Sequence, residues 1–228
     1  MEIPENWSEF NDYLLEDSIL SEKWSKLQTF IAAQDEETIV YPPIEMRFKA
    51  LEMVNPENTK VFICGQDVYP REGQGMGLAF SVPSGITIPP SLKTIYKGIF
   101  NYCGSCPTNG DLTYLAKQNV LLLNSALTVK AGKANSHQAN WSFFTDILIK
   151  WLSETQHKIV FILWGNHAKE KASLICKNNG HYIIGGTHPS PMAHRDHSKP
   201  HPFLNTNYFG LANEFLEANH NTTIQWAG

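Results

Sequence analysis

Four short apolar runs recur along this chain of 228 residues, and each run ends in a glycine or a polar residue. They are VFICG at Val61, VLLLN at Val120, IVFILWG at Ile159 and YIIGG at Tyr182. Runs of this kind are typical of buried parallel strands. Segments with helical spacing separate or follow them, at 91–102, 111–118, 141–152, 167–176 and 211–218. The alternation predicts an α/β fold with about four strands in a short central parallel sheet and helices on both faces.

The N-terminal region differs from the rest because it contains no apolar run of the strand type. Two helices are expected there, at 7–33 and 44–54, separated by a YPP turn at Tyr41. No internal repeat, linker or low-complexity tract marks a second domain. We therefore expect one domain over 1–228, with an N-terminal helical part at 1–55 that caps the sheet and catalytic loops of 56–228.

Composition limits where the protein works. No apolar run approaches the roughly 18 residues that a membrane span needs, and the first ten residues lack the basic and then apolar order of a signal peptide. Four scattered cysteines indicate free thiols in a reducing compartment. The expected location is the cytoplasm, or the nucleus or another DNA compartment if the source is eukaryotic or viral.

The net charge of −4 argues against indiscriminate coating of nucleic acid, which needs clustered lysine and arginine. Any DNA contact must therefore be local. The one candidate is THPSPMAHRDHSKPHPF at 187–203, where histidines and two cations crowd together without a run of acids. Charge alone favours the alternative that this stretch is a solvated, proline-rich surface loop.

Polar residues follow each predicted strand, where the ligand crevice of an open parallel sheet lies. Gln66, Asp67 and Tyr69 follow the first strand, Asn124 ends the second, Gly165 and Asn166 follow the third, and His188 follows the fourth, with Phe80 a short loop after the first group. Each residue alone has a structural explanation, such as a helix cap, a turn or a core aromatic. Their joint placement predicts a hydrolytic site that uses neither a metal ion nor a nucleophilic serine.

Two other groups of residues have the spacing of a metal or redox site. CGSC at 103–106 has no second cysteine pair and does not open a helix of a thioredoxin-like unit. His194, His197 and His201 have Pro200 and Pro202 among or beside them, which prevents a regular helical display of zinc ligands. We expect surface histidines and no metal.

The motifs, in order from about Tyr41 to the C-terminus, resemble those of the main (family 1) uracil-DNA glycosylases. The residues that carry the resemblance are GQDVYP at Gly65, GLAFS at Gly77, PPS at Pro89, LLLNSALTV at Leu121, WG at Trp164, HPSP at His188 and the near-terminal Trp226. Val68 replaces the family's proline, Pro70 replaces its histidine, and Leu115 replaces a usual tryptophan. Loss of the proline is expected to loosen the turn that aims Asp67, and loss of the histidine puts a phosphate or water contact in doubt.

The resemblance implies a DNA repair enzyme that flips uracil out of single- or double-stranded DNA and hydrolyses its N-glycosidic bond. Asp67 would position water and His188 would donate a hydrogen bond to the departing uracil. The residues implied to hold uracil are Gln66, Tyr69, Phe80 and Asn124, and those implied to contact DNA are Pro89, Pro90, Ser91, Gly165, Asn166, Pro189, Ser190, Pro191, Met192 and Arg195. Met192 would be the wedge that fills the vacated stack.

The same resemblance implies no cofactor, a monomer, no membrane, and uracil-containing DNA as the partner, with the family's DNA-mimicking inhibitor protein as a further partner. The alternative function, raised by the altered first motif, is a DNA-binding or replication-accessory protein that keeps the glycosylase fold with weakened catalysis.

Overall fold

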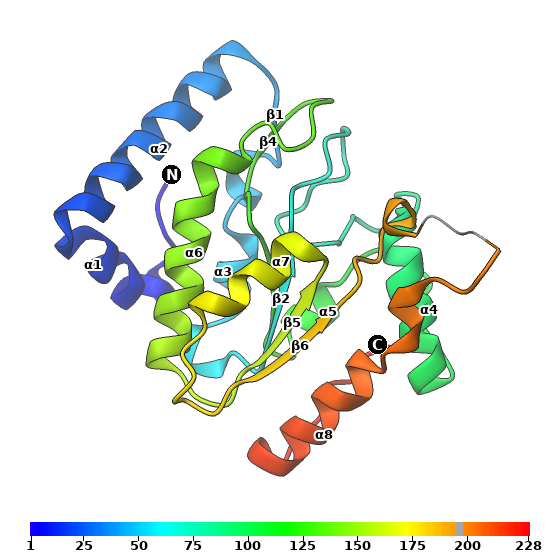
Figure 1. Ribbon diagram of the computed structural model, residues 1–228. Coiled ribbons are helices and arrows are strands. Elements are labelled where there is room, and N and C mark those ends of the chain that lie inside the picture. The colour runs from blue at the N-terminus through cyan, green and yellow to red at the C-terminus, as the bar shows by residue number, and fades with distance from the viewer. Residues whose placement is uncertain (195–197) are drawn as a thin grey trace.

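A computed structural model describes residues 1–194 and 198–228, and its centre is a four-stranded parallel sheet (Figure 1). The strands are β2 (Val61–Gly65), β3 (Val120–Asn124), β5 (Val160–Trp164) and β6 (Tyr182–Gly186). They lie in the order β3-β2-β5-β6, so the four expected strands and their parallel arrangement are confirmed. All residues of the first three are buried, which explains why these strands read as unbroken apolar runs.

Helices cover both faces of the sheet, as predicted. In Figure 1, α2 (Ser18–Glu37), α3 (Lys49–Met53) and α6 (Gln138–Thr155) lie to the left of the sheet, whereas α4 (Pro90–Cys103) and α8 (Tyr208–His220) lie to its right. Each layer has its own aromatic cluster. Phe10, Trp24, Phe48, Trp141 and Phe144 pack together in the first layer, and Trp164, Phe203, Tyr208, Phe209 and Trp226 pack in the second.

The helix expected over 7–33 is instead two helices after a 3-10 turn at Glu5–Trp7. They are α1 (Ser8–Glu16) and α2, and the break falls at Asp17, whose backbone is extended. The Asp17 side chain accepts hydrogen bonds from the amides of Ile19 and Leu20. This is an N-cap, so the second helix starts afresh where the sequence shows an acid followed by serine.

Other expected helices are shorter or interrupted. The segment 44–54 forms a 3-10 turn at Ile44–Met46 before α3, and the helix expected over 111–118 narrows to α5 (Thr113–Ala116). The helix expected over 167–176 divides into α7 (Asn166–Glu170) and a 3-10 turn at Lys171–Leu174. Further 3-10 turns span Pro56–Asn58, Pro191–Ala193 and Pro202–Asn205.

A small second sheet was not expected from the sequence. β1 (Val40–Tyr41) pairs antiparallel with β4 (Val129–Lys130), with Val40 opposite Lys130 and Tyr41 opposite Val129. The Tyr41–Pro42 peptide bond in the YPP turn is cis. Strands of two residues carry too little pattern to be recognised in sequence. This pair ties the end of the N-terminal region to the loop that follows β3.

No helix in the described part of the chain is long and apolar enough to span a bilayer. The division at residue 55 into a helical part and a sheet part stays a prediction.

Candidate active site

The polar residues that end or follow β2, β3 and β6 meet at the carboxyl end of the sheet, whereas Gly165 and Asn166 after β5 line a neighbouring hollow. A cavity of about 220 Å³ is lined by Gln66, Asp67, Val68, Tyr69, Pro70, Phe80, Ser91, Asn124, Ala134, Asn135 and His188. The six residues expected to hold uracil or act on it are all among them. In the sheet, β3 lies on one side of β2 and β5 lies on the other, so the chain changes side of β2 between β3 and β5. The cavity therefore lies at the switch point where an open α/β sheet binds its ligand.

Asp67 is positioned by a loop that approaches from the far side of β3. The backbone N–H of Asn135 donates to Asp67 Oδ2. Asp67 Oδ1 is buried and has no hydrogen-bond partner among residues 1–194 and 198–228. Burial raises the pKa of Asp67 to about 6, although the amides of Asn135 and Val68 oppose the shift. One oxygen is thus held while the other is available within the cavity.

The loop at 131–136 was missed in the sequence analysis. It is anchored to the Asp67 segment by two contacts: the Gly132 amide donates to Pro70 O at 2.7 Å, and Gln66 Nε2 donates to Asn135 Oδ1 at 3.1 Å. The available signal was the run Asn135-Ser136-His137 between a strand and a helix. Three hydrogen-bonding residues at such a junction are typical of a loop that satisfies other backbone groups.

Behind this loop, His137 at the N-cap of α6 makes a buried polar contact with the residue that precedes β4. Its Nδ1 lies 2.9 Å from Thr128 Oγ1, which also accepts a hydrogen bond from Trp141 Nε1 at 2.6 Å. The His137 ring packs edge-on against Phe30 of α2. Burial lowers the pKa of His137. The loop that positions Asp67 is therefore fixed to the first aromatic layer.

In the altered first motif, the two replaced residues, Val68 and Pro70, each contact a neighbouring loop. Val68 is buried, and a Cβ added at Gly75 would lie 2.7 Å from Val68 Cγ1. The valine side chain thus packs directly on the backbone of the following loop, while Pro70 is tied to Gly132. The loosening expected from loss of the family's proline stays a prediction. Leu115 is buried in the core, as expected for a packing change.

Asn124 reaches the cavity because the neighbouring strand has no side chain opposite it. Gly65 pairs with Asn124 in the β2–β3 register, and a Cβ at Gly65 would lie only 2.0 Å from Asn124 Oδ1. Any larger residue would displace the amide. The Asn124 side chain is 8% exposed, so its amide forms part of a nearly closed wall.

Phe80 lies on a strained backbone that aims its ring at the cavity. Its φ is 65°, a left-handed conformation that is unusual for a bulky residue. The preceding Ala79 amide donates to Leu122 O at 3.0 Å, which fixes the loop to β3. Tyr69 Oη donates to Phe80 O at 3.3 Å, and burial raises the pKa of Tyr69, so its hydroxyl stays protonated. Behind, Phe80 packs edge-on against Trp164 with ring centroids 5.6 Å apart.

His188 is held in one tautomer. The Ser190 amide donates to His188 Nδ1 at 3.0 Å, so in the neutral ring the proton is on Nε2. Burial lowers the pKa of His188, and the neighbouring His201 lowers it further. A Cβ at Gly165 would lie 2.9 Å from His188 Cβ, and Gly165 has a φ of 87°. Glycine is therefore required for the imidazole to approach the end of β5.

The residues expected to contact DNA lie on three segments around this cavity. Pro89 caps α4, Pro90 begins it, and Ser91 lines the cavity beside His188. A neighbouring hollow of about 320 Å³ is lined by Gly165, Asn166 and Met192 together with His188 and three other residues. Met192 is 93% exposed, the largest exposed fraction of any large hydrophobic residue in the described chain. Arg195 and His197 lie outside the described residues.

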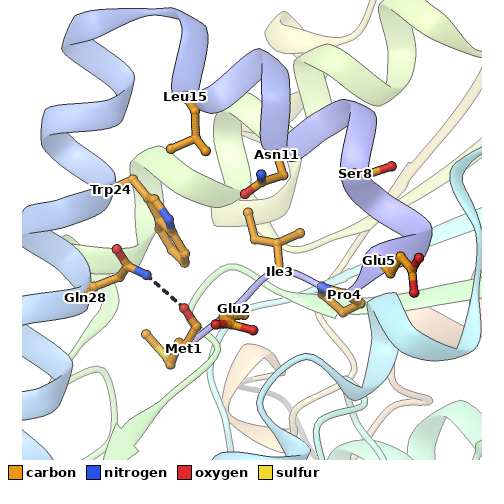
Figure 2. Close-up of a pocket in the computed structure, with 10 residues that line it drawn as sticks. All are labelled: Met1, Glu2, Ile3, Pro4, Glu5, Ser8, Asn11, Leu15, Trp24 and Gln28. Atoms are coloured by element: carbon orange, nitrogen blue, oxygen red, sulfur yellow. Dashed lines mark hydrogen bonds between the residues drawn. The ribbon is translucent and has the colours of Figure 1, made fainter.

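A larger cavity lies elsewhere and lacks these groups. It encloses about 480 Å³ between the N-terminal segment and the helices α1 and α2 (Figure 2). Gln28 Nε2 donates to Met1 O at 2.8 Å across it, and Trp24 forms one wall. Its side chains include Glu2 and Glu5 but no histidine, so we assign the active site to the smaller cavity. No group of three metal-binding side chains occurs in the described residues.

Comparison with known proteins shows which family this chain is similar to. A family model for the uracil DNA glycosylase superfamily matches residues 51–217. The uracil-DNA glycosylase of Campylobacter concisus is 42% identical over 99% of this chain and 94% of its own, and that of Oceanobacillus iheyensis is 42% identical over 95% and 94%. The crystal structure of mimivirus uracil-DNA glycosylase has a TM-score of 0.85 at 27% identity, covering 97% of this chain and 86% of that one.

A variant of mimivirus UNG in complex with UGI superimposes with a TM-score of 0.89. The sheet, the cavity at its strand ends and the solved structures define an α/β glycosylase. The chain belongs to the uracil DNA glycosylase superfamily.

Proposed function

We propose that this protein is a DNA repair enzyme that excises uracil from DNA by hydrolysing its N-glycosidic bond. The observation that supports this most strongly is the single cavity that collects Asp67, Tyr69, Phe80, Asn124 and His188. These groups supply a carboxylate, a stacking face, a readable amide and a hydrogen-bond donor. Family membership and the curated relatives named uracil-DNA glycosylase support the same activity.

Uracil is recognised by stacking and by its hydrogen-bonding edge. Phe80 offers its ring face, and the Asn124 amide pairs with a carbonyl acceptor and the neighbouring imide donor of uracil. Cytosine presents the opposite pattern at that edge. Because the Asn124 amide lies in a buried wall against Gly65, a bound cytosine would leave buried polar groups unpaired.

Tyr69 excludes thymine. Its ring lines the cavity, and its hydroxyl is tied to the Phe80 carbonyl, so it cannot swing away without breaking that bond. The ring presses on the edge of the base that carries a methyl group in thymine. Gln66 contributes by donating a hydrogen bond from its side chain to Asn135.

The chemistry is electrostatic. As the glycosidic bond breaks, the sugar becomes cationic and uracil leaves as an anion. The Asp67 carboxylate stabilises the sugar cation, and its buried Oδ1, which has no partner in the described chain, orients the attacking water. Water adds to the sugar carbon, and its proton passes by way of the carboxylate or solvent to the uracil anion, so the products are an abasic site and neutral free uracil. No cofactor takes part in this scheme.

His188 stabilises the leaving group as a neutral donor. Since Ser190 occupies Nδ1, the Nε2–H is directed away from its own loop and donates to the uracil carbonyl oxygen as charge develops there. The lowered pKa of His188 keeps the ring neutral at pH 7. A neutral donor gives up no proton, so the ring is ready for the next turnover.

Extraction of the base precedes chemistry. An unstacking cost of a few kcal/mol is met by contacts to the DNA backbone. The three rim segments that contain Pro89–Ser91, Gly165–Asn166 and Pro189–Pro191 supply these contacts, together with Arg195, and the exposed Met192 enters the vacated stack. Single-stranded and duplex DNA are both substrates, because a base outside a stack needs no wedge.

The protein acts as a monomer in the cytoplasm, where its four free cysteines stay reduced. The complexes of mimivirus UNG with UGI support binding of the same DNA-mimicking inhibitor here.

The test is release of free uracil from single-stranded and duplex oligonucleotides that contain one uracil, with the same oligonucleotides containing thymine as controls. We expect rapid release from uracil DNA and none from thymine DNA, and loss of release in the Asp67→Asn variant. Binding of DNA without release by the wild-type protein would instead identify a replication-accessory protein that keeps the glycosylase fold.

A further inference from the structure

His201, thirteen residues after His188, lies in the loop that leads into the last helix. Its Nε2 is 3.0 Å from the carbonyl oxygen of Ser190, and its Nδ1 is 3.2 Å from the Phe203 amide. A backbone N–H can only donate and a carbonyl can only accept. Both contacts therefore require the same neutral ring, with the proton on Nε2 and the lone pair on Nδ1.

Ser190 is thus held on both sides of its backbone. Its carbonyl accepts from His201 and also from the Ala193 amide at 2.9 Å, whereas its own amide donates to His188 Nδ1. The two peptide groups joined at Ser190 thus connect His201 to the Nδ1 contact that fixes the tautomer of His188. Without the His201 bond, only the short turn at Pro191–Ala193 would orient the Ser190 carbonyl.

The other end of this chain of hydrogen bonds is fixed in the core. Phe203 is fully buried, and its ring packs against Trp164 at 5.0 Å and against Tyr208 at 4.8 Å. Trp164 also supports Phe80, the stacking residue of the cavity. His201 therefore connects the His188 loop to the same aromatic layer that supports the base-stacking ring.

We propose that His201 is a positioning residue for uracil excision, which orients the His188 donor through the backbone N–H and C=O groups of Ser190. The proposal rests on the function proposed above for His188. A charge on His201 would also oppose a charge on His188, which agrees with the direction of the pKa shift of His188. His201 itself touches neither base nor sugar, because it is absent from the lining of the 220 Å³ cavity.

Two substitutions separate the two bonds of His201. In His201→Asn, the side-chain oxygen replaces Nδ1 and still accepts from Phe203, but the donor to Ser190 is lost. In His201→Gln, the longer amide replaces Nε2 and still donates to Ser190, but the bond to Phe203 is lost. A role in capping the turn at Pro202–Asn205 would require the asparagine-like function, whereas positioning of His188 requires the glutamine-like function.

The experiment measures single-turnover excision at saturating enzyme, and binding of an uncleavable uracil oligonucleotide. We expect His201→Asn to lower the single-turnover rate on the order of tenfold while DNA affinity stays within about twofold, since small misplacement of a reacting group is costly. His201→Gln should keep most of the rate. In a His188→Ala background, His201→Asn should have no further effect.

Nitrogen NMR of the His188 ring gives a readout that does not depend on activity. The wild type and His201→Gln should show a lone pair on Nδ1 and a proton on Nε2, whereas His201→Asn should show a mixture of tautomers. A full rate and a single His188 tautomer in His201→Asn would overturn the proposal, as would equal loss in both variants or an undiminished loss in the His188→Ala background. If the wild type showed the expected tautomer but released no uracil, the proposed function would fail and the positioning contact would stand.

Discussion

The loop after β2 and the loop after β6 each present one ionisable group to the same cavity, but they hold it by different contacts. The Asp67 carboxylate is held by the Asn135 amide, 68 residues further along the chain. The His188 imidazole is held by the Ser190 amide, two residues away. Burial raises the pKa of Asp67 to about 6 and lowers that of His188, so it favours the neutral form of both.

The comparison shows that one environment has opposite consequences for the two groups. The proposed chemistry needs Asp67 charged and His188 neutral. Burial therefore prepares His188 but works against Asp67, and the Asn135 amide partly restores the charge on the carboxylate. A group that must stay charged in a closed cavity needs a hydrogen-bond donor to offset its burial, whereas burial itself favours a group that must stay neutral.

The largest effect is expected at the carboxylate. Asp67→Asn should slow uracil release by about 100-fold or more and leave DNA binding largely intact, because activation of water contributes about 10² to 10⁴. Release is measured under single-turnover conditions, and affinity with an uncleavable uracil oligonucleotide. Near-normal release would remove Asp67 from the mechanism.

Stability provides the folding control for this variant. The folded-state pKa of about 6 lies above the usual value of 3.8, so the ionised carboxyl destabilises the folded protein as pH rises through this window. After allowance for partial exposure, Asp67→Asn should be about 1–2 kcal/mol more stable than wild type at pH 7.5 and equal to it near pH 4. A large loss of stability would mean that slow release reflects misfolding.

The second largest effect on the rate is expected at His188. His188→Ala should lower the rate on the order of 100-fold, in line with removal of one preorganised donor to a developing anion. His188→Gln is the matched variant, since its amide retains a donor and should recover part of the rate. An unchanged rate in the alanine variant at saturating DNA would assign leaving-group stabilisation to backbone amides near Gln66.

The pH dependence of the excision rate tests the protonation states of Asp67 and His188 together. Since release needs an ionised Asp67 with a pKa of about 6, the rate should be constant above pH 7 and should fall about tenfold per pH unit below pH 6. The fall in rate should become steeper at lower pH, where His188, with its lowered pKa, becomes protonated. The acid limb is measured by single-turnover release at constant ionic strength. A rate that rises as pH falls would show that protonated His188 is the active form.

The smallest effect on the excision rate is expected at Met192, the proposed wedge, which lies outside the cavity that contains Asp67 and His188. Met192→Ala should lower excision by about tenfold for U:A pairs, less for U:G mismatches, and within about twofold for single-stranded DNA, because a base already unstacked needs less help. A bulky synthetic residue opposite uracil should restore much of the rate. Measurements use matched salt, since ionic strength alone changes DNA affinity steeply. Equal losses on all substrates would exclude a wedge role.

The same contrast explains what the sequence could and could not predict. The four strands were predicted because each is an uninterrupted apolar run, although only β2, β3 and β5 are fully buried. Asp67, Asn124 and His188 were found because each ends or follows such a run. The loop at 131–136 was missed because its contact with Asp67 joins residues 68 positions apart in the sequence and leaves no local periodicity. The β1–β4 pair that anchors this loop is too short to show a pattern.

The predictions of helix boundaries were wrong for a different reason. The periodicity of 7–33 continues through Asp17, so only the cap at that residue could have indicated the break. Roles that depend on the absence of a side chain, at Gly65 and Gly165, are likewise visible only when the neighbouring strand or loop is known. The family resemblance named the reacting residues but not the contacts that hold them.

The space left by Gly65 has a consequence for how this enzyme could evolve or be engineered. Asn124 occupies the place that any β-carbon on the adjacent strand would take, within 2.0 Å of its oxygen. A single methyl group at position 65 would therefore displace the amide proposed to read the base, although Gly65 is not among the residues that line the cavity. Libraries that vary only the lining residues would leave out this position, which controls where the Asn124 amide lies.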